Sequence, residues 1–250
     1  DTASGFIFVS NVSGAPDQRD GKGFISKLSN DGKMITASWV SGFNAPKGLR
    51  SHNGTLWTAD LDEVIGIDIA GGKIASRTKI DGAKFLNDVA VGDDGTVYVS
   101  DTVASRIYAV KDGKSSVFAE GDDIEYPNGL LVDGNRIIVG GWGKPEADFS
   151  TKVPGRLFSL DLKTKKKTLI TPEPSANIDG VESDGQGGYI ISDFIAGKVL
   201  QVGANGSIRT VKQLKQGTAD LAYVPASKLV IVPNMNESKV AAYDLAGTLQ

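Results

Sequence analysis

The chain has 250 residues, a formal net charge of −3 and 40% hydrophobic residues, which suits one large all-β domain or two small domains with a real core. The acidic balance argues against nucleic acid or an anionic membrane as a partner, because both bind basic surfaces. Cysteine is absent, which excludes disulfides and thiolate chemistry, and no apolar run approaches the roughly 18 residues that span a bilayer.

The first elements in chain order are three short runs with strand character, at 5–11, 24–29 and 34–40. They match the second, third and fourth strands of the units that follow. We therefore expect a first inner strand that is missing from the printed chain, or whose place another segment fills. No signal peptide is visible, and the compartment stays open between the cytoplasm and, if a leader was removed, the periplasm or the exterior.

Five similar hairpins follow, each with a polar residue, a strand, a Gly-containing turn and a second strand. They cover 45–60, 86–101, 127–141, 178–193 and 218–234. Turn pairs such as Asp94-Gly95 and Asp133-Gly134 supply the positive φ that tight hairpins need. A third strand follows every hairpin and a fourth follows most of them, whereas no long amphipathic helix is present.

The leading polar residues of these hairpins are spaced by 40, 41, 51 and 41 residues. They are Lys47, Asn87, Asn128, Asp179 and Asp220. A four-stranded unit repeated about every 40 residues is typical of a propeller blade. The sequence therefore predicts an all-β, six-bladed β-propeller over 1–250 as a single domain. An irregular β-sandwich is the alternative, but a sandwich needs no fixed period.

In a propeller the first strand of each blade begins, and the second ends, at one face. The five leading residues are therefore expected to form one ring at the mouth of the central channel. A second ring beside it would hold Asn11, Asp60, Asp101, Asp193 and Asn234. These strand-end residues have a competing explanation, since Asp and Asn also cap turns.

Oxygen ligands without thiolate or imidazole suit a hard cation such as Ca²⁺, with Mg²⁺ or Mn²⁺ as alternatives. The only histidine, His52, falls in a hairpin turn at the opposite face. A Ser-His-Asp hydrolase is therefore disfavoured.

Three motifs stand in register with blade order: "FLND" (85–88), "YPNGLLV" (126–132) and "NIDGVESDGQGGYIISD" (177–193). With them the chain resembles the gluconolactonase and regucalcin (senescence marker protein) family of six-bladed propellers. The resemblance implies a divalent cation held by Asn128 and Asp179, with Asn87 near metal and substrate. It also implies a Glu ligand from the missing inner strand.

One position departs from that family. The family's lactonases often carry a substrate-binding Arg where this chain has Phe85, and an apolar ring does not replace a guanidinium fork. Aldonolactone specificity is therefore in doubt. Lys47 belongs with Phe85 and Asn87 in the expected substrate-binding set.

The resemblance implies metal-assisted hydrolysis of a small lactone or ester, in which the cation stabilises the oxyanion and Asp179 takes the proton from water. Loops 12–23 and 142–155 both follow second strands and are expected above the site as lids, with Trp142 and Lys152 facing the substrate. The alternative is a non-catalytic propeller that binds a ligand or protein. Strictosidine-synthase-like and paraoxonase-like propellers share the architecture, but the latter depend on histidine chemistry.

Overall fold

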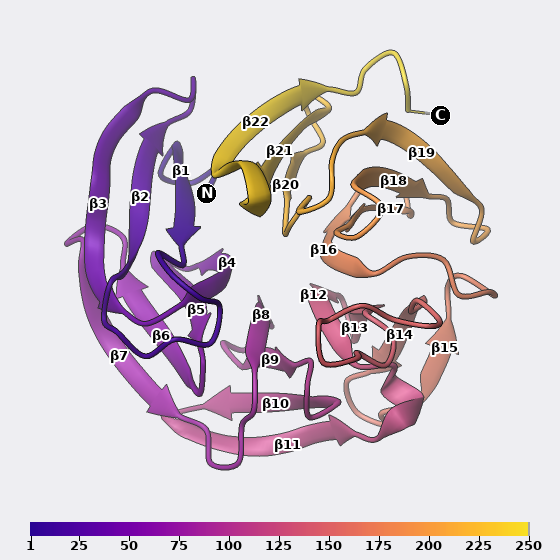
Figure 1. The fold of residues 1–250 in the computed structure, drawn as a ribbon, viewed down its shortest axis with the longest axis horizontal. Coiled ribbons are helices and arrows are strands. Elements are labelled where there is room, and N and C mark those ends of the chain that lie inside the picture. The colour runs from indigo at the N-terminus through magenta and orange to yellow at the C-terminus, as the bar shows by residue number, and fades with distance from the viewer. Residues whose placement is uncertain (250) are drawn as a thin grey trace. The chain divides into compact units, whose positions relative to one another are not determined.

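The computed structural model describes residues 1–249 and confirms the all-β class, with six antiparallel sheets as the blades of a propeller (Figure 1). Among residues 1–249 helix is limited to two single turns, η1 (Asp122–Ile124) and η2 (Met235–Glu237). Within the described residues no helix has the length and apolar character needed to cross a membrane. Two compact units divide the chain after Phe118; a single domain over 1–250 stays a prediction.

The first unit contains three blades, and each blade is an antiparallel sheet in chain order. The first blade is β1 (Phe6–Asn11), β2 (Gly23–Ser29) and β3 (Met34–Phe43). The second is β4 (Pro46–His52), β5 (Thr55–Asp60), β6 (Glu63–Asp68) and β7 (Lys73–Lys79). The third is β8 (Leu86–Val91), β9 (Val97–Asp101), β10 (Arg106–Lys111) and β11 (Lys114–Glu120), whose last two residues belong to the second unit.

The second unit contains the other three blades. The fourth blade is β12 (Pro127–Asp133), β13 (Arg136–Gly141), β14 (Leu157–Asp161) and β15 (Lys167–Leu169). The fifth is β16 (Ile178–Ser183), β17 (Tyr189–Asp193), β18 (Lys198–Val202) and β19 (Ile208–Gln213). The sixth is β20 (Ala222–Val224), β21 (Leu229–Asn234) and β22 (Lys239–Asp244).

The first and sixth blades have three strands each among the described residues, as the strand pattern predicts. In the first blade β1 is an edge strand that pairs with β2 in the register Phe6↔Ser29 to Asn11↔Phe24. The inner strand of the sixth blade has only three residues, because residues 219–221 separate it from the isolated Thr218↔Asn234 bridge at which the other inner strands begin.

The core lies between neighbouring blades of each unit. Side chains of β5, β6, β8 and β9 form one buried cluster in the first unit, including Ala59, Val64, Val89 and Val99. In the second unit Ile138 of β13 packs with residues of β16 and β17. All residues of β9 ("VYVSD", 97–101) are buried. A strand that is buried on both faces does not need to alternate apolar and polar residues.

Candidate functional site

Four inner strands carry the same irregularity near their first residue. The ladder to the second strand skips two residues between Pro46 and Leu49, Leu86 and Val89, Pro127 and Leu130, and Ile178 and Val181. We call the first skipped residue of each the bulge residue; these are Lys47, Asn87, Asn128 and Asp179. A bulge re-aims side chains at one end of a sheet, which is how the fold sets this position apart.

The sixth blade corrects the register predicted from spacing. Thr218 pairs with Asn234 as Ile178 pairs with Asp193, so the residue equivalent to Asp179 is Ala219, not Asp220. Asp220 lies one position later, and the prediction that it leads its blade is wrong. The repeat of about 40 residues locates the leading residue of a blade only to within one position, whereas the pairing of the strands fixes its register.

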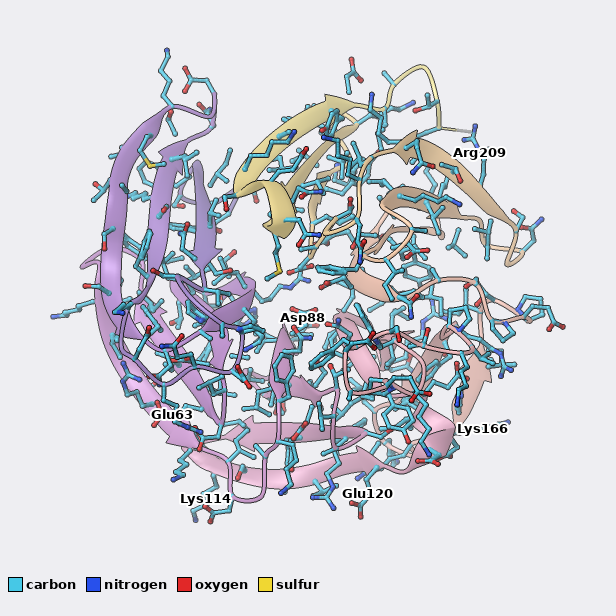
Figure 2. All side chains as sticks on the ribbon, in the orientation of Figure 1. Glu63, Asp88, Lys114, Glu120, Lys166 and Arg209 are labelled. Atoms are coloured by element: carbon cyan, nitrogen blue, oxygen red, sulfur yellow. The ribbon has the colours of Figure 1, made fainter. Side chains whose placement is uncertain are left out.

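Asp220 instead resembles Asp88, the residue after the bulge residue of the third blade. Asp88 Oδ1 accepts a hydrogen bond from Val89 N at 2.7 Å, and Asp220 Oδ1 accepts one from Leu221 N at 2.8 Å. Figure 2 shows Asp88 on the inner strand β8, whereas Lys114 begins the outer strand β11 of the same blade. Both aspartates therefore bond locally to their own strands.

Glycine follows the bulge residue in the other blades because neighbouring inner strands approach closely there. A Cβ at Gly48 would lie 2.1 Å from Asp88 Oδ1, and one at Gly129 would lie 2.3 Å from the Asp179 carbonyl oxygen. No side chain fits at these distances. The glycine of the Pro-Asn-Gly motif is thus required by packing against the next blade.

Buried serine hydroxyls hold two of the bulges in place. Ser100 Oγ accepts a hydrogen bond from Asp88 N at 2.9 Å, and Ser192 Oγ accepts one from Gly180 N at 2.7 Å. Both serines are fully buried. Neither serine was predicted as a site residue, although the Ser-Asp pair is repeated at 100–101 and 192–193.

The acidic residues at the ends of second strands bind the linkers between blades. Asp60 accepts hydrogen bonds from Asn44 N at 2.8 Å and Ala45 N at 2.7 Å. Asp101 does the same for Lys84 N and Phe85 N, at 2.7 and 3.0 Å. These contacts support the turn-capping explanation for this second set.

Asn128 and Asp179 are the two bulge residues of the second unit, and both are buried. Asn128 is 2% exposed, and its Oδ1 has no hydrogen-bond partner among the described residues. Asp179 is 9% exposed. Burial, together with the nearby Asp220 carboxylate, raises the pKa of Asp179 well above its ordinary value. A lone buried amide oxygen and a desolvated carboxyl are both groups that a ligand would satisfy.

These donors fit a hard cation by type, since amide and carboxylate oxygens are ligands of Ca²⁺ and Mg²⁺. Their number is small: the described residues contain no group of three or more Asp, Glu, His or Cys side chains arranged to hold a metal ion. Asn87, the third predicted ligand, lies in the first unit, where its Nδ2 donates to Thr102 Oγ1 at 3.4 Å. Its ligand role stays a prediction.

Lys47 and Phe85 of the predicted substrate-binding set contact each other. Lys47 Nζ lies 4.4 Å from the centroid of the Phe85 ring and donates a hydrogen bond to the Ala45 carbonyl at 3.1 Å. Burial lowers the pKa of Lys47 to about 8, partly opposed by the negative charges of Asp60 and Asp17. The amine is therefore partly neutral near pH 7.5.

The loop after β1 lies at the bulge end of the second blade, as predicted. Arg19 forms an ion pair with Asp62 at 2.9 Å, and Gly21 N donates to Asn44 Oδ1 at 3.3 Å. Asn44 precedes β4, so the loop reaches the end of the strand that carries Lys47.

The loop after β13 lies at the bulge end of the fourth blade, again as predicted. Trp142 N donates to the Tyr126 carbonyl at 3.0 Å, and Asn177 Nδ2 donates to the Trp142 carbonyl at 2.7 Å. The Trp142 indole is buried: it donates to the Phe149 carbonyl at 3.0 Å and its ring centroid lies 5.6 Å from that of Phe194. Trp142 thus anchors the loop.

Lys152 of the same loop is the most exposed of the predicted substrate-binding residues. Its side chain is 86% exposed, and Nζ lies 3.2 Å from Glu146 Oε1. The ion pair directs the amine within the loop. Its predicted contact with substrate, like that of Trp142, stays a prediction.

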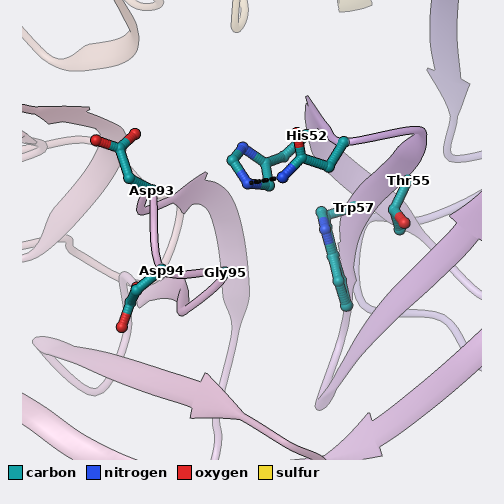
Figure 3. A pocket seen from close by; sticks show the side chains of 7 residues that line it. His52, Thr55, Trp57, Asp93, Asp94 and Gly95 are labelled. Atoms are coloured by element: carbon teal, nitrogen blue, oxygen red, sulfur yellow. Dashed lines mark hydrogen bonds between the residues drawn. The ribbon is translucent and has the colours of Figure 1, made fainter.

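The opposite end of the second and third blades carries a shallow cavity of about 330 Å³ (Figure 3). It lies between the β4–β5 and β8–β9 turns and is lined by His52, Asn53, Thr55, Trp57, Asp93, Asp94 and Gly95. The His52 and Asn53 side chains are 2.9 Å apart. His52 is the last residue of β4, at the other end of that strand from Lys47 as predicted, but it belongs to the strand and not to the turn, because it pairs with Thr55 across the hairpin.

No family model matches the chain, and no curated protein matches it either. Solved structures match its fold. A nidogen/laminin complex aligns with a TM-score of 0.76 at 14% identity, over 98% of this chain and 91% of that one. Catalytically inactive H270A virginiamycin B lyase from Staphylococcus aureus, solved with quinupristin, aligns at 0.64 and 12%, over 94% and 76%. A streptogramin B lyase aligns at 0.61 and 13%, over 87% and 71%.

Proposed function

We propose that this propeller is a divalent-metal-dependent hydrolase of small lactones or other carboxylic esters. The observation that carries the proposal is the buried Asn128 Oδ1, which lacks a hydrogen-bond partner among the described residues, in the same unit as the desolvated Asp179 carboxyl. An unsatisfied buried carbonyl oxygen is costly unless a ligand completes it. Oxygen ligands favour Ca²⁺, with Mg²⁺ or Mn²⁺ as alternatives.

The residues have separate roles in the proposed reaction. Asn128 Oδ1 and the Asp179 carboxylate would hold the cation, whereas a ligand role for Asn87 stays a prediction from the sequence. A bound divalent cation supplies electrophilic stabilisation to the oxyanion of the tetrahedral intermediate. Asp179 takes the proton from the attacking water, which requires the ionised carboxylate. Lys47 and Phe85 are proposed to contact the substrate.

A second candidate is a non-catalytic propeller that binds a ligand or another protein. One neighbour is a nidogen/laminin complex, and two others are lyases. Fold similarity at 12–14% identity does not separate an enzyme from a binding module.

The proposal is tested by adding Ca²⁺, Mg²⁺ or Mn²⁺ to chelator-treated protein and measuring cation binding by calorimetry and hydrolysis of a panel of lactones and esters. Asp179→Asn keeps the shape but removes a charge and the base, so binding and turnover are both expected to fall at least tenfold. Glu182→Gln, a partly buried carboxylate later on the same strand, is the matched control.

Turnover that persists in Asp179→Asn, corrected for the folded fraction, contradicts the catalytic role. A wild-type protein that binds no cation contradicts the metal site. Cation binding without turnover of any lactone or ester favours the binding propeller instead.

A further inference from the structure

The cavity between the β4–β5 and β8–β9 turns of the first unit lies at the opposite end of these blades from the bulge residues (Figure 3). An inference drawn from it is therefore independent of the proposed metal site. Its volume of about 330 Å³ is at the lower end of the range for small-molecule sites, which is about 300–1,000 Å³. The cavity thus has room for one small ring.

The half-buried indole of Trp57 forms one wall of this cavity. Its six-membered ring lies against Gly66 of β6, where a Cβ would be 3.0 Å from Trp57 Cζ3, and the side chain also packs on the core cluster of the second and third blades. Figure 3 shows the indole edge-on, with one face toward the turn that carries Asp94 and Gly95. A Cβ at Gly95 would meet no atom within 4 Å, so the space beside this turn is open. The cavity therefore offers an aromatic face that is supported from behind and open in front.

Two of the polar side chains that line the cavity are already engaged by the protein. Asp94 Oδ2 lies 2.5 Å from Lys111 Nζ, which neutralises the charge of this carboxylate. The His52 ring lies 2.9 Å from Asn53 Nδ2. The net negative charge of the lining therefore comes from Asp93.

Three other polar groups of the lining have no hydrogen-bond partner among the residues that the structure describes. They are the Trp57 indole N–H, the Thr55 hydroxyl and the Asp93 carboxylate. The indole N–H can only donate, the carboxylate can only accept, and the hydroxyl can do both. A simple ammonium ion would leave the indole N–H without an acceptor, and Asp93 would repel an anion. The ligand that satisfies all three groups is neutral and carries donors and acceptors together.

We propose that this cavity binds one ring of a neutral saccharide. The C–H face of the sugar ring stacks on Trp57, since an indole combines an apolar face with a polar N–H at its edge. One sugar hydroxyl accepts a hydrogen bond from the indole N–H, and another donates to the Asp93 carboxylate. A shallow site with few contacts binds weakly, and we expect a Kd of about 1 mM.

The test follows the indole N–H signals of the folded wild-type chain in ¹H–¹⁵N spectra. The chain has three tryptophans and therefore three such signals, and the signal that is missing in Trp57→Phe identifies Trp57. The probes are the methyl glycosides of glucose, galactose, mannose and N-acetylglucosamine, each titrated to about 50 mM. At least one of them should shift the Trp57 signal with saturation, while the signals of Trp39 and Trp142 stay in place. No saturable shift of the Trp57 signal with any of the four would overturn the proposal.

A pair of variants tests the polar contact. Asp93→Asn keeps the shape of the side chain and removes its charge, so the Kd should rise by about threefold or more. Asp112→Asn, in the β10–β11 turn of the same unit, is the control and should leave the Kd unchanged. Both positions are exposed, so neither change should affect folding. Equal affinities of Asp93→Asn and wild type would contradict the site.

Tetramethylammonium is the probe for the competing ligand class. It should leave the Trp57 signal in place, because it has no acceptor for the indole N–H. A saturable shift with this ion and with none of the glycosides would make the cavity a cation site and overturn the saccharide proposal.

Discussion

Gly129 of the fourth blade lies directly against Asp179 of the fifth, so that a Cβ at Gly129 would be 2.3 Å from the Asp179 carbonyl oxygen. The same would-be Cβ lies 2.9 Å from Val181 Cγ2. The obstacle on one side is backbone, which cannot rotate away. The position of the Asp179 bulge is therefore fixed in part by the absence of a side chain on the neighbouring strand.

Gly129→Ala is expected to lower the free energy of unfolding by about 2–3 kcal/mol through overpacking. Urea denaturation measures the loss. Gly92→Ala is the control, because its added Cβ would meet the flexible Asp94 side chain at 3.1 Å and no backbone atom closer than 3.7 Å. Equal stability of the two variants would show that the inner strands separate easily.

The buried Asp179 carboxyl should destabilise the cation-free protein at neutral pH. Its pKa is raised in the folded state by burial and by Asp220, so the folded chain holds a proton that the unfolded chain releases. Stability is then lost as pH rises from the ordinary value of 3.8 through the folded pKa. Asp179→Asn should therefore be more stable than wild type at pH 7 in chelator, by about 1–2 kcal/mol.

That difference should vanish at pH 3, where the carboxyl is protonated in both states. Thermal or urea unfolding at the two pH values in chelator provides the comparison. A variant that is less stable than wild type at pH 7 would mean that Asp179 is ionised and paired in the folded chain.

Ser192→Ala removes the acceptor for the Gly180 N–H, which then remains buried without its 2.7 Å hydrogen bond. The expected loss of stability is about 1–3 kcal/mol. Ser207→Ala, at an exposed turn in the same unit, should change stability by less than about 0.5 kcal/mol. Equal effects in urea denaturation would argue against a structural role for the Ser192 hydroxyl.

Trp142→Phe keeps an aromatic ring near Phe194 but removes the indole N–H that bonds to the Phe149 carbonyl at 3.0 Å. Amide hydrogen exchange in residues 143–151 should therefore become faster, while global stability falls by about 1 kcal/mol. Lys152→Ala breaks only an exposed ion pair and should alter global stability by less than about 0.5 kcal/mol. Unchanged exchange in Trp142→Phe would remove the anchoring role.

The repeat along the chain was enough to predict the all-β class, the number of blades and the three-stranded first blade. Each blade is a local antiparallel unit whose turn residues and strand residues are adjacent in sequence, so its signal survives in the sequence alone. The positions of Asn128 and Asp179 at the start of inner strands followed from the same repeat.

Pairing between strands decided what the repeat left open. Asp220 moves out of the set of bulge residues because Thr218, and not Ala219, pairs with Asn234. The burial of Ser100 and Ser192, the inward turn of the Trp142 indole and the exposure of Lys152 also depend on contacts between distant segments. A periodic sequence specifies which residues face the same side of a strand. A bulge shifts that register, and its position depends on packing against the neighbouring blade. This packing is determined only by the tertiary structure.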